Sequence, residues 1–396
     1  MKHNKVQQLY NKLCLTSVFQ GVVENALFEK FFAYCETDAN DKAKKRKAYA
    51  AFVAEIYLHG SSITKLVEKL VFEDENVYVK AVANDQTPAD VVCQAVEKEL
   101  AAFAEFSLLT VDDFAEDMGE NAEDLPAFDC EYTHLVLRYK KRLENVKKFG
   151  YGIFSSQGMF RLSDEKQIQP IASADKVSMD DFIGYEQERE QVVANTRAFI
   201  EGRHAANVLL CGDAGAGKSS TVKAVANAFY SEGVRLIELR KDQLSLLPLV
   251  MSKIVGNPLK FIIFIDDLSF NRSDDNFSML KAALEGSASA KADNAVIYAT
   301  SNRRHIIKES FGDREGDDVH RNDTLQETLS LSERFGLVVL FSKPNKPLYL
   351  QIVKELAKKH GVEMQESELE TQAEAFALRK GNRSARCAEQ FIQSLK

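Results

Sequence analysis

One segment of the sequence has the residue types and spacing of a phosphate-binding loop. It is glycine-rich and ends in a lysine and a serine: Gly212-Asp213-Ala214-Gly215-Ala216-Gly217-Lys218-Ser219. Small residues allow backbone N–H groups to surround a phosphate, and the N-terminus of a following helix favours an anion. Lys218 could bridge the β- and γ-phosphates of a nucleotide, and the Ser219 hydroxyl could bind Mg²⁺. An apolar run precedes the loop and a helical pattern follows it, so the sequence predicts a P-loop for a nucleoside triphosphate, with Ser220 as a further contact.

Two adjacent carboxylates follow another apolar run, residues 261–265. They are Asp266 and Asp267, and Asp266 lies 48 residues after Lys218. Carboxylates at the end of a buried strand are costly unless they face a site. We expect Asp266 to bind Mg²⁺ and Asp267 to polarise the water that attacks the nucleotide. The alternative for Asp267 is an acidic N-cap of the next helix.

The elements that must position these residues begin near residue 178. Short apolar runs alternate with helical segments, and the runs cover residues 207–211, 234–239, 261–265, 295–299 and 337–341. This alternation predicts a five-stranded parallel sheet with helices on both faces. After Phe341 the pattern is helical: Pro347 suits a first helical position, Gly361 suits a helix end, and residues 367–370 (Ser-Glu-Leu-Glu) match a capping box.

The front of the chain has a different pattern. Residues 1 to about 106 show helical periodicity, and residues 151–154 and 159–162 are predicted to pair as a short hairpin. We therefore predict four parts: a mainly α-helical N-terminal domain (1–150), a hairpin or linker (151–177), a nucleotide-binding α/β domain (178–344) and a C-terminal helical lid (345–396).

Composition excludes several classes of protein. The chain has 396 residues, a net charge of −8 and 45% hydrophobic residues, which is typical of a globular protein. The longest apolar stretch, residues 48–54, is far shorter than the roughly 20 residues that a membrane span needs. The start of the chain has no apolar signal region, and no pair among the six cysteines has Cys-x-x-Cys spacing. We expect a cytoplasmic protein.

Charge is distributed unevenly along the front half. Residues 42–47 are strongly basic, residues 107–137 contain nine acidic residues and no Lys or Arg, and residues 138–142 are basic again. The first basic run could be a solvated helix end or loop, or it could contact nucleic acid, and we favour the first interpretation. The acidic block and the second basic block could neutralise each other across a helix pair.

Further motifs resemble those of the AAA+ ATPases. Asn302, after the strand predicted at 295–299, matches the sensor-1 position. Arg334, within Ser-Glu-Arg-Phe-Gly just before the last strand, resembles the arginine finger. Arg386 aligns best with sensor 2, and Arg383 is the second choice. The segment Asp181-Phe182-Ile183-Gly184-Tyr185 resembles the box that surrounds the adenine, so Ile183, Gly184 and Tyr185 are expected to contact the nucleotide.

A closer resemblance covers about residues 150–396. Segments at 195–196, 264–270, 284–286, 298–305 and 329–336 are similar to an uncharacterised bacterial family of predicted AAA+ ATPases. The usual AAA+ pattern has Asp-Glu where this chain has Asp266-Asp267. Because Asp is one methylene shorter than Glu, the resemblance implies that water activation could be slow.

Three other candidates have structural alternatives. Arg303-Arg304-His305 could form ion pairs or could contact phosphate, a neighbouring subunit or nucleic acid. Arg314, in a charged segment predicted to be a surface loop, is a rival to Arg334. Cys211 beside the P-loop is more simply a small core residue than a nucleophile.

Together these features predict an ATPase. The chain is expected to bind ATP and Mg²⁺, to hydrolyse ATP to ADP and phosphate, and to use Arg334 in trans within a homo-oligomer that remodels an unidentified protein or nucleic-acid client. The alternative is a switch or scaffold that binds ATP with little turnover.

Overall fold

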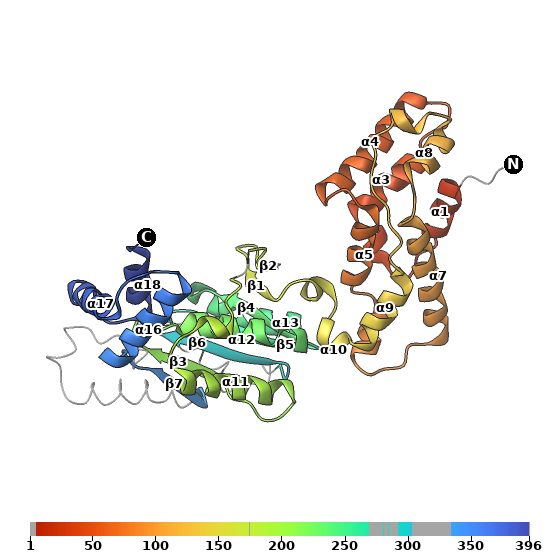
Figure 1. Cartoon of the computed structure of the whole chain (residues 1–396). Helices are drawn as coiled ribbons and strands as arrows, with labels where there is room; N and C mark the ends of the chain where they lie inside the picture. Colours follow the sequence, from red (N-terminus) through yellow and green to blue (C-terminus); the bar gives the residue numbers. More distant parts are fainter. Residues whose placement is uncertain are drawn as a thin grey trace. The chain divides into compact units, whose positions relative to one another are not determined.

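The computed structural model describes residues 5–173, 175–268, 280, 284, 292–302 and 334–395. It divides into two compact units, Met1–Ser156 and Gln157–Lys396. Figure 1 shows the elements of both units.

The N-terminal unit is helical, which confirms the prediction for this part of the fold. Its α-helices are α1 (Lys5–Leu13), α2 (Gln20–Val23), α3 (Ala26–Cys35), α4 (Lys42–Leu58), α5 (Ile63–Glu73), α6 (Val77–Ala83), α7 (Asp90–Phe106), α8 (Val111–Met118), α9 (Leu135–Glu144) and α10 (Val146–Phe149). Aromatic rings from α3, α4, α7 and α8 form its core, and Phe31, Phe52, Phe106 and Phe114 are all fully buried. Ring pairs such as Phe28–Phe106, with centroids 4.7 Å apart, add to the apolar burial.

The charge blocks of this unit pair differently from the sequence prediction. The basic run starts α4, where Lys45 forms a buried ion pair with Asp117 (2.6 Å) and Arg46 contacts Glu120 (2.6 Å). The acidic block therefore neutralises the first basic run. The second basic run contacts other helices, since Arg138 pairs with Glu68 on α5.

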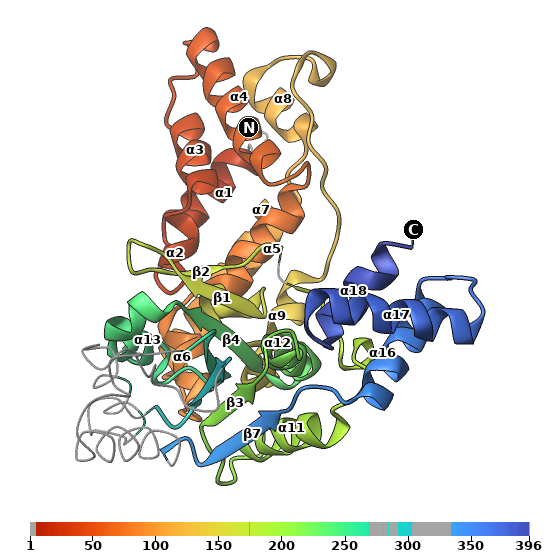
Figure 2. The same ribbon diagram turned by 90° about the vertical axis from the view of Figure 1, so that its left-hand side faces the viewer.

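The second unit contains a seven-stranded sheet with the order β2-β1-β4-β5-β6-β3-β7 (Figure 2). The strands are β1 (Met159–Leu162), β2 (Ile168–Pro170), β3 (Val208–Gly212), β4 (Val234–Leu239), β5 (Lys260–Ile265), β6 (Ala295–Ser301) and β7 (Leu337–Phe341). Five neighbouring strands of the sheet, β4, β5, β6, β3 and β7, are parallel, as predicted. Their carboxyl ends share one edge, which places the loops after β3, β5 and β6 side by side.

Two strands were not part of the predicted sheet. β1 pairs in parallel with β4, and β2 pairs antiparallel with β1. The predicted hairpin is wrong in its first arm, because Gly152–Ser155 forms a 3-10 helix instead. The positive φ of Gly150 and Gly152 interrupts any extended run there.

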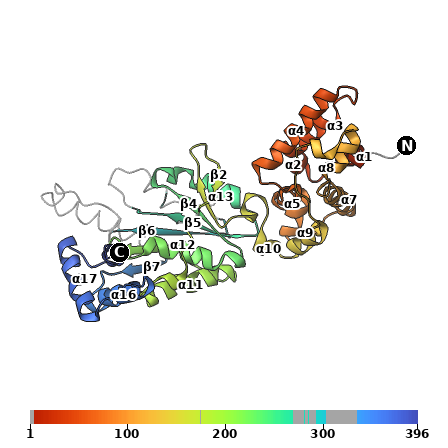
Figure 3. The same ribbon diagram turned by 45° about the horizontal axis from the view of Figure 1, so that its top comes forward.

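Helices cover both faces of the sheet, as predicted (Figure 3). On one face lie α11 (Glu186–Ile200) and α12 (Lys218–Ala228), which bury Val192, Phe199 and Val222 against the strands. On the other face lies α13 (Leu247–Ile254), which begins with Pro248 in its first turn. Burial on both faces explains why the strands read as continuous apolar runs.

Three helices form the predicted C-terminal lid: α16 (Lys346–Lys359), α17 (Glu366–Lys380) and α18 (Ala385–Gln393). They have their own apolar core. Pro347 lies in the first turn of α16 and Gly361 follows its end with φ +65°, both as predicted. The predicted capping box is wrong, because α17 begins at Glu366 after Gln365, which makes no side-chain cap.

Within the described ranges, no helix is both long enough and apolar enough to span a bilayer.

Candidate active site at the carboxyl edge of the sheet

The glycine-rich segment connects β3 to α12, as the sequence predicts. β3 ends at Gly212 and α12 begins at Lys218, which follows Gly217 in a left-handed conformation (φ +84°). A Cβ on Gly212 would overlap the carbonyl oxygen of Phe341 on β7, so only glycine fits there. The loop therefore packs tightly on the sheet and leaves the amides at the start of α12 open to an anion.

Lys218 is almost fully buried inside this loop (5% exposed). Its ammonium donates hydrogen bonds to the carbonyl oxygens of Gly212 (3.0 Å) and Asp213 (2.7 Å) and to Oδ1 of Asn302 (3.0 Å). Burial lowers the pKa of Lys218, and nearby acidic groups, Asp213 above all, oppose that shift. Among the described residues, the acceptors bound to this ammonium are all neutral, so the loop holds a cation at a fixed position without a bound anionic partner there.

Asp266 meets the P-loop helix across the sheet edge. Its Oδ1 accepts hydrogen bonds from Ser219 Oγ (2.6 Å) and Thr300 Oγ1 (2.5 Å). A hydroxyl beside a carboxylate is a hard oxygen donor set of the kind that binds Mg²⁺. Ser219 and Asp266 therefore fit the metal role that the sequence assigns to them.

Asp267 has an unusual backbone. Its φ is +50°, a left-handed conformation that costs a non-glycine residue about 1–3 kcal/mol. Three hydrogen bonds hold it there: its N–H donates to Thr300 Oγ1 (3.0 Å) and to Asp266 Oδ1 (3.1 Å), and Asn302 Nδ2 donates to its Oδ1 (2.7 Å). The residues that would form a helix after Asp267 lie outside the described part of the chain from residue 269, so its alternative role as an N-cap stays open.

Thr300 is the residue of this site that the sequence analysis did not assign. It lies near the end of β6, is 1% exposed, and contacts Asp266 through its side chain and Asp267 at the backbone N–H. A sequence signal for Thr300 was present, because a polar Thr-Ser-Asn triplet ends an apolar strand. Of that triplet, only Asn302 was predicted to be a site residue.

The site residues line a cavity of about 230 Å³. P-loop residues, both aspartates, Thr300 and Asn302 form its walls, and Arg386 from the lid also lines it. Arg383 does not line this cavity; its guanidinium binds Glu374 through two bonds of 2.9 and 2.8 Å, which raises the pKa of Arg383 and lowers that of Glu374. The geometry therefore favours Arg386 over Arg383 as the lid arginine that reaches a nucleotide.

A second cavity of about 490 Å³ adjoins the first and shares Gly215, Gly217, Ser220 and Arg386 with it. Ile183 and Tyr185 line this cavity together with lid residues from α16 and α18. Gly184, between them, has φ +74°, and a Cβ there would lie 2.5 Å from Leu348 of the lid.

Tyr185 also has a structural role. Its hydroxyl donates to the carbonyl oxygen of Ser342 (2.6 Å), and burial raises its pKa to about 12. The predicted adenine box thus lies between the P-loop and the lid.

Arg334, like Arg383, is a predicted site residue that lines neither cavity. It precedes β7, whose residues Leu337 and Phe341 pair with Val208 and Gly212 of β3. Arg334 is therefore at the amino end of the sheet, about 15 Å or more along the strands from the P-loop.

Several candidates from the sequence lie outside the described residues. They are the basic triplet at 303–305, Arg314 and the residues just before Arg334.

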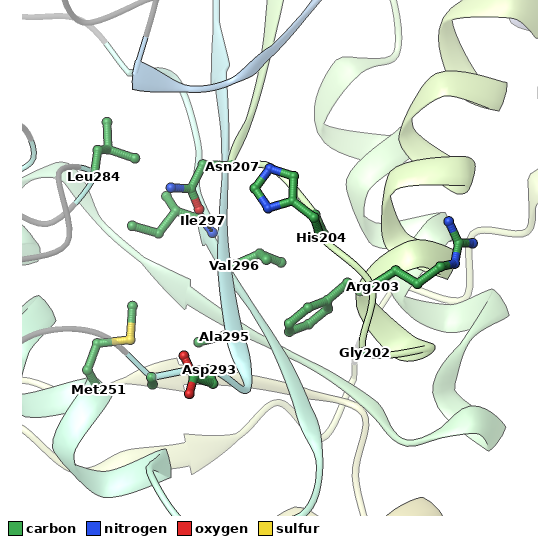
Figure 4. A pocket seen from close by; sticks show the side chains of 13 residues that line it. Gly202, Arg203, His204, Asn207, Met251, Leu284, Asp293, Ala295, Val296 and Ile297 are labelled. Atoms are coloured by element: carbon green, nitrogen blue, oxygen red, sulfur yellow. Dashed lines mark hydrogen bonds between the residues drawn. The ribbon is translucent and has the colours of Figure 1, made fainter.

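Another cavity, of about 390 Å³, lies at the opposite edge of the sheet (Figure 4). Two of its polar groups have other partners: Asn207 Oδ1 accepts from the N–H of Ile297 (2.8 Å), and Arg203 binds Glu201 (2.7 Å). Figure 4 shows the Arg203 side chain directed away from the cavity. Among the described residues, this cavity has no converging polar groups comparable to those at the P-loop.

A family model described as "Protein of unknown function (DUF815)" matches residues 156–396, more than half of the chain. The chain belongs to the DUF815 family. This confirms the resemblance to an uncharacterised family over the same part of the sequence. A search of curated proteins gave no match.

Solved structures similar to this DUF815 protein include RuvB of Thermotoga maritima. A structure of a RuvB point mutant is 17% identical over 55% of this chain and 63% of its own, with a TM-score of 0.38. A structure titled as the RuvB Holliday junction branch migration motor is 15% identical over 55% of this chain and 70% of its own, with a TM-score of 0.34. The chain thus spans less than two thirds of the first of these structures. The P-loop fold with a helical lid that the AAA+ resemblance implied is confirmed by the chain's own strand order and lid.

Proposed function

We propose that this DUF815 protein is an ATPase that binds ATP with Mg²⁺ between the P-loop and the acidic pair and hydrolyses it to ADP and phosphate. One observation carries the proposal: a continuous chain of hydrogen bonds links the P-loop to both aspartates. It runs through Ser219, Asp266, Thr300, Asp267, Asn302 and Lys218.

The loop supplies the binding of phosphate. Open amides at the start of α12 and the ammonium of Lys218 provide positive charge in a buried site, where electrostatic attraction is stronger than in water. A phosphate would give Lys218 the negative partner that the carbonyl groups of Gly212 and Asp213 lack.

Ser219 and Asp266 would hold Mg²⁺ when it is bound. The ion would neutralise the charge of the phosphates during transfer. Thr300 keeps the Asp266 carboxylate in place through a bond of 2.5 Å.

Asp267 is the group that we assign to water activation. Its carboxylate lines the cavity, and Asn302 fixes one of its oxygens, which leaves Oδ2 to accept a proton or orient a water. Arg386 lines the same cavity and would stabilise the phosphate charge from the lid.

Arg334 supports an oligomeric form of this proposal. It lies just before the amino end of β7, an edge strand among the described residues, and does not line the cavity of its own chain. We propose that it acts in trans in a homo-oligomer in the cytoplasm, which converts hydrolysis into remodelling of a protein or nucleic-acid client.

A slow ATP-dependent switch is the second candidate. The observation that favours it is the side chain of Asp267, which is short and already held by Asn302 at 2.7 Å. A carboxylate restrained in this way orients water less freely than a longer one, so ATP would be retained with little turnover.

The test is ATP-dependent thermal stabilisation of Lys218→Ala beside Lys223→Ala. Lys223 lies on the same helix and pairs with Asp175 (2.9 Å), but it lines neither cavity. At about 100 times Kd, Mg-ATP should stabilise the unchanged protein and Lys223→Ala by roughly 2.7 kcal/mol. Lys218→Ala should show no such shift.

Equal stabilisation of the Lys218→Ala and Lys223→Ala proteins would refute the binding site. Release of phosphate by the unchanged protein then separates the two candidates, since an ATPase should turn over at about 1 s⁻¹ or faster and a switch far more slowly.

A further inference from the structure

Arg189 lies on α11 and lines the 490 Å³ cavity, but not the smaller cavity at the P-loop. Its side chain is 8% exposed. In the described part of the chain, no acceptor lies within hydrogen-bonding distance of its guanidinium, and its only ion pair is with the exposed Glu186, 3.8 Å from Nη2. The guanidinium is on the cavity wall and its donors are not used by the described protein groups, so a ligand in the cavity could supply the acceptors.

The surroundings hold this guanidinium in one orientation. It lies over the ring of Phe182 at 5.1 Å from the centroid, and Phe182 in turn packs 3.7 Å from the position of a Cβ on Gly217. The donors of Arg189 are thus fixed relative to the P-loop.

Other cations of the cavity have different roles. Lys359 binds Asp181 at 2.7 Å, and Arg386 lines both cavities and so lies nearer the phosphate end. Arg189 is therefore placed to meet the part of a nucleotide that extends beyond the phosphates.

We infer that Arg189 contacts the nucleobase and that the site consequently accepts guanine nucleotides as well as adenine nucleotides. Arginine carries only donors. Guanine presents two adjacent acceptors, O6 and N7, that a guanidinium can bind together, whereas adenine presents N7 beside an amino donor and so accepts one bond. The inference rests on the proposed function, because it assumes that the P-loop binds the triphosphate.

The test measures affinity of the full-length protein for Mg-GTP, Mg-ATP and inorganic tripolyphosphate by calorimetry. The unchanged protein should bind GTP at least as tightly as ATP. Arg189→Met removes the donors and keeps the apolar part of the stem, and it should weaken GTP binding about tenfold or more, ATP binding less, and tripolyphosphate binding by less than about twofold.

Arg197→Met is the matched control. Arg197 is on the same helix and lies 4.8 Å over the ring of Phe229, but it lines neither cavity. It should leave all three affinities unchanged. Arg189→Lys keeps the charge and the fold but cannot bind two acceptors with one fork, so it should remove the preference for GTP over ATP.

Two results would overturn the inference: GTP binding that is unchanged in both Arg189 variants, or tripolyphosphate binding that falls as much as GTP binding. Lys218→Ala separates this from failure of the proposed function. If that variant still binds all three ligands as the unchanged protein does, the P-loop assignment itself is wrong.

Discussion

Thr300→Val tests the geometry of the site, because valine has nearly the same shape and lacks the hydroxyl. The hydroxyl donates to Asp266 at 2.5 Å and accepts from the N–H of Asp267 at 3.0 Å. A hydrogen bond to a charged group contributes about 1.5–3 kcal/mol. If that contribution acts on the transition state, its loss should slow hydrolysis roughly 10- to 150-fold.

The left-handed backbone of Asp267 strengthens this expectation. Its strain of about 1–3 kcal/mol is balanced by the contacts to Thr300 and Asn302. Without the hydroxyl of Thr300, Asp267 can relax away from its position in the cavity.

The assay is phosphate release at saturating Mg-ATP, with ATP affinity measured in parallel. We expect Thr300→Val to lower kcat while ATP affinity changes only a few-fold, since Lys218 and the loop are unaltered. Thr300→Ser retains the hydroxyl and should keep most of the activity. Turnover of Thr300→Val at the unchanged rate, or equal loss in both variants, would show that the hydroxyl does not position the acidic pair.

Three further substitutions follow from the same site. Asp267→Asn should retain ATP binding and lose phosphate release, and full activity of this variant would assign water activation to another group. Arg334→Ala should bind ATP within a few-fold of normal but lose about 10³- to 10⁵-fold in rate, and an excess of Lys218→Ala subunits should restore part of it in mixtures. Loss of activity that mixing cannot restore would argue against action in trans. Arg386→Ala should reduce phosphate release strongly, whereas Arg383→Ala should affect only lid stability in thermal unfolding; the reverse order would exchange their roles.

Local patterns in the sequence predicted most of the fold. The five parallel strands occur within one or two residues of their predicted positions, because strands covered on both faces must be continuously apolar. The P-loop was equally predictable, since its glycines and its position between a strand and a helix are local features. The hairpin observed between β1 and β2 was harder to predict than the P-loop. Its pairing depends on the neighbouring strand β4 as well as on the turn.

The contacts of the site were decided by the tertiary structure. Thr300 meets Asp266 from 34 positions away, and Asn302 meets Lys218 from 84 positions away. Such pairs exist only because β3, β5 and β6 end at one edge of the sheet.

Tertiary structure also decides which arginines of this protein face the cavities. By itself, the sequence determined that a P-loop, an acidic pair and several arginines are present, because each is written in adjacent residues. Only the folded chain decided that Arg386 reaches the cavity, that Arg383 is bound to Glu374, and that Arg189 is buried without a hydrogen-bond acceptor among the described residues. Which charge faces a ligand depends on the packing of the lid and α11 around the cavity, and no local pattern encodes that packing.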